Sequence, residues 1–104
     1  MGRVAFKMWL KEGVFEEYTK RHDEIWPELV QLLKDNDISD YTIFMDTDRK
    51  TLFAIQSQGP NYNEMDLKSH PIMRKWWDYM ADLMEVEEDH APTVSTLNPV
   101  FYLE

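Results

Sequence analysis

Tyr18 and His22 have the side chains and the spacing that proton-transfer chemistry requires. They lie four residues apart in YTKRHDEIWPEL (18–29), so on a helix one ring sits above the other on the same face. Histidine, whose unperturbed pKa is about 6.5, can both give and accept a proton near neutral pH. The spacing alone fits equally a half-buried structural histidine bonded to a carbonyl, which is the more common outcome on an apolar face.

Two neighbouring tryptophans suggest a second kind of chemistry. Trp76 and Trp77 lie in RKWWDYM (74–80), and adjacent helical residues point about 100° apart. One indole can therefore pack in the core while the other reaches the rim of a cavity, where an indole face beside polar groups suits a sugar ring. Two large core residues are the alternative, and the spacing alone favours that alternative. Tyr41, at the start of an expected strand, is either a strand aromatic or a phenol directed into a pocket.

The elements that must position these residues follow from hydrophobic periodicity. Alternating apolar residues predict strands, and steps of three and four predict amphipathic helices. The expected order is strand 3–10, helix 12–36, strand 41–45, strand 51–55, a helical stretch ending near 84 with its strong part starting at Pro71, a loop over 85–96 and strand 99–103. This β-α-β-β-α-β order predicts a single α+β domain over residues 1–104. We expect a ferredoxin-like fold, with two helices on one face of a four-stranded antiparallel sheet.

Pro27 falls inside the first expected helix. A proline there removes a backbone hydrogen bond and crowds the carbonyl of Asp23, at a cost of ~3 kcal/mol. A kink or a restart just past His22 is therefore expected. The kink could position the imidazole, or it could only wrap the helix around the sheet, and the sequence leaves both open.

Composition excludes several classes of function. The net charge is −9, which disfavours nucleic acid and membrane surfaces as partners. The chain has no cysteine and only three glycines, so neither thiolate chemistry nor a phosphate-binding loop is expected. His70 and His90 lack ligand partners at helical spacing, so no metal site is expected. The N-terminus has no signal-peptide core and no segment reaches the ~20 apolar residues of a membrane span, which favours a soluble cytoplasmic protein.

One face of the expected sheet is too apolar to remain open. Trp9, Phe44 and Phe53 fall on the face that the two helices do not cover. We therefore expect a homodimer packed sheet to sheet.

Several blocks, in order and spacing, resemble the L-rhamnose mutarotase family nearly end to end: AFKM, EYTKRHDEIWPEL, YTIF, LFA, RKWWDYM and VFYL. The H-x-x-I-W-P-E-L and W-W-x-Y-M blocks are specific. The resemblance implies a homodimer of ferredoxin-like subunits, a dimeric α/β barrel without cofactor or metal, that interconverts the α and β anomers of L-rhamnose. It further implies that His22 is the proton donor and that Tyr18, Tyr41, Trp76 and Trp77 contact the sugar. The acceptor of the anomeric proton stays open between Tyr18, Tyr41, an acidic residue and water.

Two other functions are compatible with the same expected fold. Small dimeric ferredoxin-like proteins include cofactor-free and haem-degrading monooxygenases, whose pockets also hold histidine and tryptophan. A non-catalytic sugar-binding module is the other alternative. Because function resides in the site, the fold alone does not separate them.

Overall fold

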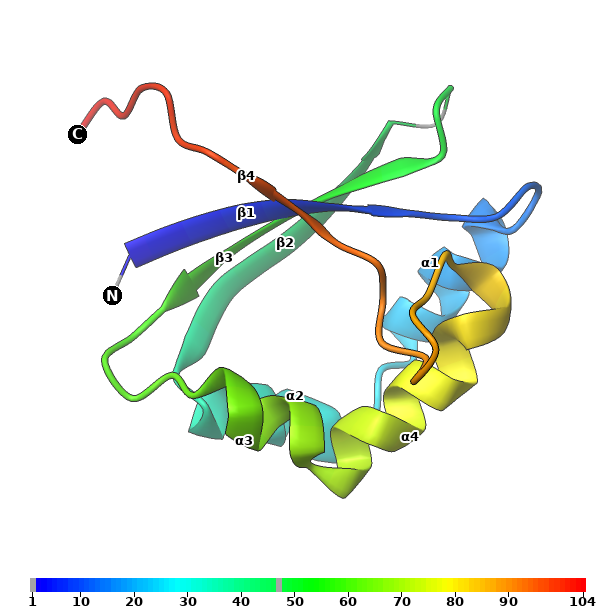
Figure 1. Cartoon of the computed structure of the whole chain (residues 1–104), viewed down its shortest axis with the longest axis horizontal. Helices are drawn as coiled ribbons and strands as arrows, with labels where there is room; N and C mark the ends of the chain where they lie inside the picture. The colour runs from blue at the N-terminus through cyan, green and yellow to red at the C-terminus, as the bar shows by residue number, and fades with distance from the viewer. Residues whose placement is uncertain (1, 47) are drawn as a thin grey trace.

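A computed structural model describes residues 2–46 and 48–104 of the chain. Four strands form one antiparallel sheet in the order β2-β3-β1-β4, and the helices lie along one of its faces (Figure 1). The elements are β1 (Gly2–Trp9), α1 (Phe15–Asp23), α2 (Pro27–Asp35), β2 (Ile38–Asp46), β3 (Thr51–Gln58), α3 (Glu64–Ser69), α4 (Pro71–Met80), the 3₁₀ helix η1 (Ala81–Leu83) and β4 (Ser95–Leu97). The expected α+β class with a four-stranded antiparallel sheet is confirmed. Thr47, in the expected turn between β2 and β3, lies outside the described residues.

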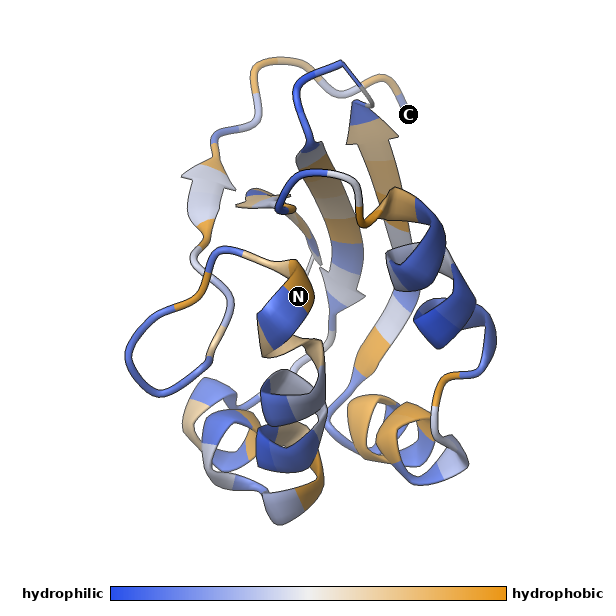
Figure 2. Ribbon diagram, turned by 90° about the vertical axis from the view of Figure 1, so that its right-hand side faces the viewer, coloured by the Kyte–Doolittle hydropathy of each residue, from blue (hydrophilic) through white to orange (hydrophobic). Residues whose placement is uncertain are grey.

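The core lies between the sheet and the helices. Polar and apolar bands alternate along the elements, as expected when each turns one face inward (Figure 2). Met8 and Leu52 are paired across β1 and β3, and both are buried. Leu29 of α2 is buried against them in the same cluster. Burying one such leucine side chain contributes about 1.5–3 kcal/mol, so these positions anchor α2 to the sheet.

The first helical stretch is two helices rather than one. α1 ends at Asp23 and α2 begins at Pro27, so the prediction of one helix over 12–36 is wrong at its centre, and the expected restart is what occurs. Trp26 takes an extended conformation (φ −65°, ψ 130°), the region that a following proline favours. Pro27 is the first residue of α2, where a missing N–H leaves no hydrogen bond unmade. The cost of ~3 kcal/mol for a proline in the interior of a helix therefore does not apply to Pro27.

The second helical stretch is also divided. α3 ends at Ser69, and α4 begins at Pro71 as expected. His70 lies between them and caps α4, because its Nδ1 accepts a hydrogen bond from the backbone N–H of Ile72 at 3.1 Å. The 3₁₀ helix η1 then continues α4 to Leu83, close to the expected end near residue 84.

Strand β2 carries an irregularity next to Tyr41. Ser39 pairs with Ser57 and Thr42 pairs with Ile55, so Asp40 and Tyr41 together face the single residue Gln56. This is a β-bulge, and Asp40 adopts a left-handed conformation there (φ 47°). Ile43, two residues after Tyr41, pairs with the buried Ala54, so alternation places Tyr41 on the helix-covered face.

The last strand differs from the prediction. β4 covers Ser95–Leu97, pairing with Ala5–Lys7 of β1, and 98–103 form no strand. Pro99 has no N–H to donate, so the ladder cannot pass through it. Beyond it the chain leaves the sheet (Figure 1), and its apolar side chains are exposed from Val100 to Leu103. The expected strand 99–103 is therefore wrong.

The face of the sheet away from the helices carries aromatic residues in register. Phe44 of β2 pairs with Phe53 of β3, which pairs in turn with Lys7 of β1. Phe44 is 58% exposed, whereas Phe53 is half-buried. This face therefore carries exposed aromatic surface in the single chain, as the alternation of the sequence predicted. No helix in the described part of the chain is long and apolar enough to cross a membrane.

Candidate active site

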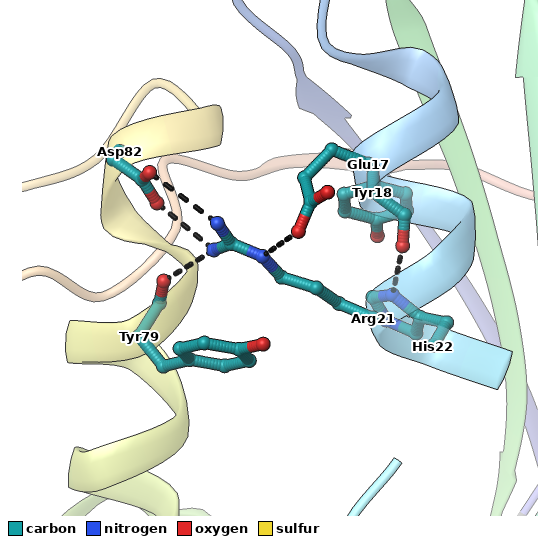
Figure 3. Close-up of polar contacts among 6 residues, drawn as sticks. All are labelled: Glu17, Tyr18, Arg21, His22, Tyr79 and Asp82. Carbon is teal, nitrogen blue, oxygen red and sulfur yellow. Dashed lines mark hydrogen bonds and ion pairs between the residues drawn. The ribbon is translucent and has the colours of Figure 1, made fainter. Parts of the chain in front are cut away.

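His22 is held by its own helix. Its Nδ1 lies 3.1 Å from the carbonyl oxygen of Tyr18, one turn earlier in α1 (Figure 3). A carbonyl can only accept, so Nδ1 carries the hydrogen and, in the neutral ring, Nε2 keeps its lone pair. The rings of Tyr18 and His22 lie 4.4 Å apart between centroids, tilted by 32°. The i, i+4 spacing thus fixes both the tautomer and the neighbour of the imidazole.

The surroundings of His22 favour its neutral form. Burial lowers the pKa of the imidazole below its ordinary value of 6.5, because the charged ring loses solvent. The hydrogen bond to the Tyr18 carbonyl and the nearby Asp23 carboxylate oppose this shift but are weaker. His22 therefore rests near neutral pH as a proton acceptor.

Trp76 forms the aromatic wall opposite His22. Its ring centroid lies 5.4 Å from that of His22 in an edge-to-face arrangement, at 86°. Trp26 meets Trp76 edge-on at 5.1 Å, and Tyr79 stacks on Trp26 at 5.6 Å. Trp76 is buried and Trp77 is half-buried, with the guanidinium of Arg74 5.3 Å from the Trp77 ring. Of the two arrangements that the sequence left open, the structure has one indole in the core and one half-buried, rather than the two core residues that the spacing alone favoured.

Two phenols of the site, Tyr18 and Tyr41, stay protonated. Burial is the main reason that the pKa of Tyr18 rises well above its ordinary value, and the neighbouring Tyr41 raises it further. Tyr41 is 38% exposed as a whole residue. Burial around its hydroxyl end nevertheless raises the pKa of Tyr41 to about 12, with a smaller contribution from Tyr62. Near neutral pH both phenols are therefore protonated and can act as hydrogen-bond donors.

All five residues predicted for the site line one cavity between the sheet and the helices. This open cavity has a volume of about 1780 Å³. Tyr18 and His22 reach it from α1, Tyr41 from the bulge in β2, and Trp76 and Trp77 from α4. The structure therefore brings together side chains from three parts of the sequence.

Sequence reasoning missed several residues in or near the site. Tyr62 lines it, and its hydroxyl is close enough to influence the pKa of Tyr41. Arg21 and Tyr79 connect α1 with the end of α4. A signal for Arg21 was present, because it lies four residues after Glu17, but helix spacing alone does not reveal a partner 58 residues away. Within residues 2–46 and 48–104, no group of three His, Asp or Glu side chains could hold a metal ion.

The fold and the site together define a class of protein. An α+β domain places a neutral imidazole, protonated phenols and indole faces around one cavity. Such a set can bind an uncharged hydroxylated ring and move protons on it.

The comparisons with known proteins narrow this class. A family model described as L-rhamnose mutarotase matches residues 3–103. The chain is 49% identical over 104 residues to an L-rhamnose mutarotase of Formosa agariphila, with both chains covered completely. It is 50% identical over 103 residues to one of Sinorhizobium fredii, covering 99% of each. The crystal structure of the L-rhamnose mutarotase from Formosa agariphila matches with a TM-score of 0.94 at 48% identity, covering 100% of both chains.

The chain belongs to the L-rhamnose mutarotase family. The resemblance seen in its sequence blocks is confirmed. Its activity is that of an isomerase, which interconverts the anomers of L-rhamnose. This separates it from the monooxygenases and the binding module that the expected fold also allowed.

Proposed function

We propose that His22 is the residue that moves the proton during anomer exchange of L-rhamnose. The observation that carries this proposal is the Nδ1 contact to the Tyr18 carbonyl at 3.1 Å. It leaves Nε2 of a neutral ring available for the sugar, next to the edge-on ring of Trp76. General acid–base catalysis by such a group contributes roughly 10²–10⁴-fold.

The reaction needs two proton transfers in each direction. In opening, the proton of the anomeric hydroxyl leaves, the C1–O1 bond becomes a carbonyl, and the C1–ring-oxygen bond breaks as that oxygen takes a proton. Neutral His22 accepts the anomeric proton at Nε2. The aldehyde then turns about C1–C2. In closing, the former ring oxygen attacks the other face of C1 as its proton returns to the phenolate or hydroxide left by opening, and the C1 carbonyl becomes C1–O1 as the imidazolium returns a proton to O1. The family resemblance implies His22 as the proton donor, and the sequence left the acceptor of the anomeric proton to Tyr18, Tyr41, an acidic residue or water. The present scheme differs, because it gives His22 both roles, as acceptor in opening and as donor in closing.

The remaining site residues hold the sugar in our proposal. Tyr18 and Tyr41, which burial keeps protonated, donate to sugar oxygens, and one of them or a water supplies the proton of the ring oxygen. Trp76 and Trp77 offer apolar faces to the C–H face of the pyranose. Every step uses side chains or water, so the scheme requires neither cofactor nor metal.

We also propose a particular assembly and topology. The strand order β2-β3-β1-β4 with antiparallel neighbours is the arrangement of a ferredoxin-like fold, formed by one domain over residues 1–104. The exposed Phe44 beside Phe53 supports a homodimer joined through the open faces of two sheets, a dimeric α/β barrel. The cytoplasmic location expected from the sequence remains a prediction.

Exchange NMR on equilibrated L-rhamnose tests the role of His22. Saturating one anomeric signal should attenuate the other faster when protein is present. Replacing His22 by glutamine (H22Q) should lower this rate by roughly 10²–10⁴-fold while the sugar still binds, since only the titrating group is lost.

A second histidine provides a matched control. His70 caps α4, and asparagine is a favoured cap, so H70N should keep both the fold and the rate. An H22Q variant as active as the parent would remove His22 from the mechanism. A parent that leaves the exchange at the buffer rate would contradict the activity itself.

A further inference from the structure

Arg21 connects the helix that carries His22 with the helix that carries Trp76. Its Nε lies 2.8 Å from a carboxylate oxygen of Glu17 in the same helix. Its Nη1 donates to the backbone carbonyl of Tyr79 at 2.6 Å and to Asp82 at 2.9 Å. Figure 3 shows the guanidinium between these three acceptors, with the Tyr79 ring below it, 4.4 Å from its carbon.

This side chain is the polar link between α1 and the rest of the fold. Among the described residues, every side-chain hydrogen bond from α1 to another element comes from Arg21. Its side chain is only 12% exposed, although Asp82 is largely in solvent. A single exposed ion pair contributes little to stability. Here one planar donor reaches three acceptors, Glu17 of α1, Tyr79 of α4 and Asp82 of η1, which fixes geometry as well as charge.

The end of α4 is a suitable anchor for a cation. Tyr79 lies in the last turn of α4, where backbone carbonyls lack partners within the helix and the helix dipole is negative. Tyr79 also packs against both Trp26 and Trp76. Arg21 is therefore hydrogen-bonded to the same residue that contacts the aromatic wall.

The position of Arg21 within α1 couples this anchor to the site. Glu17 and Arg21 form one i, i+4 row, and Tyr18 and His22 form the next row, about 100° around the helix. Fixing the first row against α4 therefore sets the rotation of α1 and the separation of His22 from Trp76. The contact between His22 and the Tyr18 carbonyl lies within α1 and cannot do this.

We propose that Arg21 is a positioning residue for the sugar reaction: by bonding the Tyr79 carbonyl and Asp82, it holds His22 at the productive distance from Trp76. Arg21 itself does not touch the reacting atoms. This inference rests on the proposed roles of His22 and Trp76.

The test compares four variants by exchange NMR at a temperature where each is folded by circular dichroism. R21M removes the charge and the donors, R21K keeps the charge, and D82N weakens one acceptor. K20M removes a charge from the exposed face of the same helix and is the matched control. We expect R21M to lower kcat roughly 10- to 100-fold with a smaller change in KM, because misplacement of a reacting group by about 1 Å can cost that much. R21K should recover part of the loss, D82N should lose less than R21M, and K20M should match the parent.

A separate readout distinguishes positioning from general destabilisation. Nuclear Overhauser contacts between the His22 and Trp76 rings should weaken in R21M and persist in K20M. A folded R21M with parental kcat overturns the inference, as does one whose kcat falls while these contacts persist. If R21M does not fold, D82N with unchanged kcat overturns it. Failure of the proposed function looks different, since H22Q would then be as active as the parent.

Discussion

The imidazole of His22 and the backbone carbonyl of Tyr18 are joined across one turn of α1, with Nδ1 and the oxygen 3.1 Å apart. The bond orients the ring and fixes the hydrogen on Nδ1. Burial then keeps the ring neutral by lowering its pKa. A residue so placed accepts a proton before it donates one.

The first prediction concerns the pH dependence of activity. Because the pKa of His22 lies below 6.5, the acid limb of the exchange rate should have its midpoint below 6.5. Activity should fall as pH decreases through that limb, since protonated Nε2 cannot accept. Rates of anomer exchange between pH 4.5 and 8, with the uncatalysed rate subtracted, measure this. A midpoint above 6.5 would contradict the burial argument.

The same shift predicts a pH dependence of stability. The folded state binds the His22 proton more weakly than the unfolded state does. The unfolded state therefore holds more protons between the lowered pKa and 6.5, and the free energy of unfolding rises with pH across that window. The contribution of His22 to the free energy of unfolding is fully present above pH 6.5 and is lost as the pH falls through the lowered pKa of the folded state. Urea titrations at pH 5 and pH 7 measure this. The free energy of unfolding should increase more between these two pH values in the parent than in H22Q, which lacks the contribution of His22.

Tyr41→Phe tests the phenol placed by the bulge. Removing the hydroxyl should lower the exchange rate about tenfold or more if it donates to the sugar, because a hydrogen bond to the reacting oxygen is lost. Thermal unfolding should change little, since the ring remains. Tyr102→Phe is the control, since this residue is 75% exposed in the C-terminal segment. Equal rates for Y41F and Y102F would exclude the Tyr41 hydroxyl from catalysis.

Pro27→Ala tests the break between the two helices. Pro27 begins α2, and a proline in a compatible conformation stabilises by about 0.4–1 kcal/mol through the unfolded state. The variant should therefore be slightly less stable in urea unfolding. If Pro27 instead interrupted one continuous helix, alanine would raise stability by up to ~3 kcal/mol. A more stable P27A would thus contradict the observed division into α1 and α2.

Phe44→Asp tests the proposed homodimer. A charge in the middle of a sheet-to-sheet interface should shift the protein to monomers in light scattering. The subunit itself should stay folded, because Phe44 is already 58% exposed in the single chain. Met65→Asp replaces a comparably exposed residue on α3 and should leave the mass unchanged. A dimeric F44D would move the interface away from this face.

The sequence by itself determined the local features. A spacing of four residues placed Tyr18 and His22 on one helix face, and alternation gave β1 its core side with Met8. Pro71 marked the start of α4, because proline is tolerated in the first turn. These features depend on backbone chemistry within a few residues, so a linear pattern contains them.

The tertiary structure decided the relationships that no short pattern encodes. The bulge at Asp40 and Tyr41 changes which residues of β2 face the helices, from Ile38 before it to Tyr41 and Ile43 after it, and it depends on how β2 pairs with β3. The 5.4 Å contact of His22 with Trp76 spans 54 positions and depends on how two helices pack. The absence of the expected strand after Pro99 also depends on the tertiary structure. Apolar alternation favours a strand, but a strand also needs a neighbouring edge and an N–H to donate.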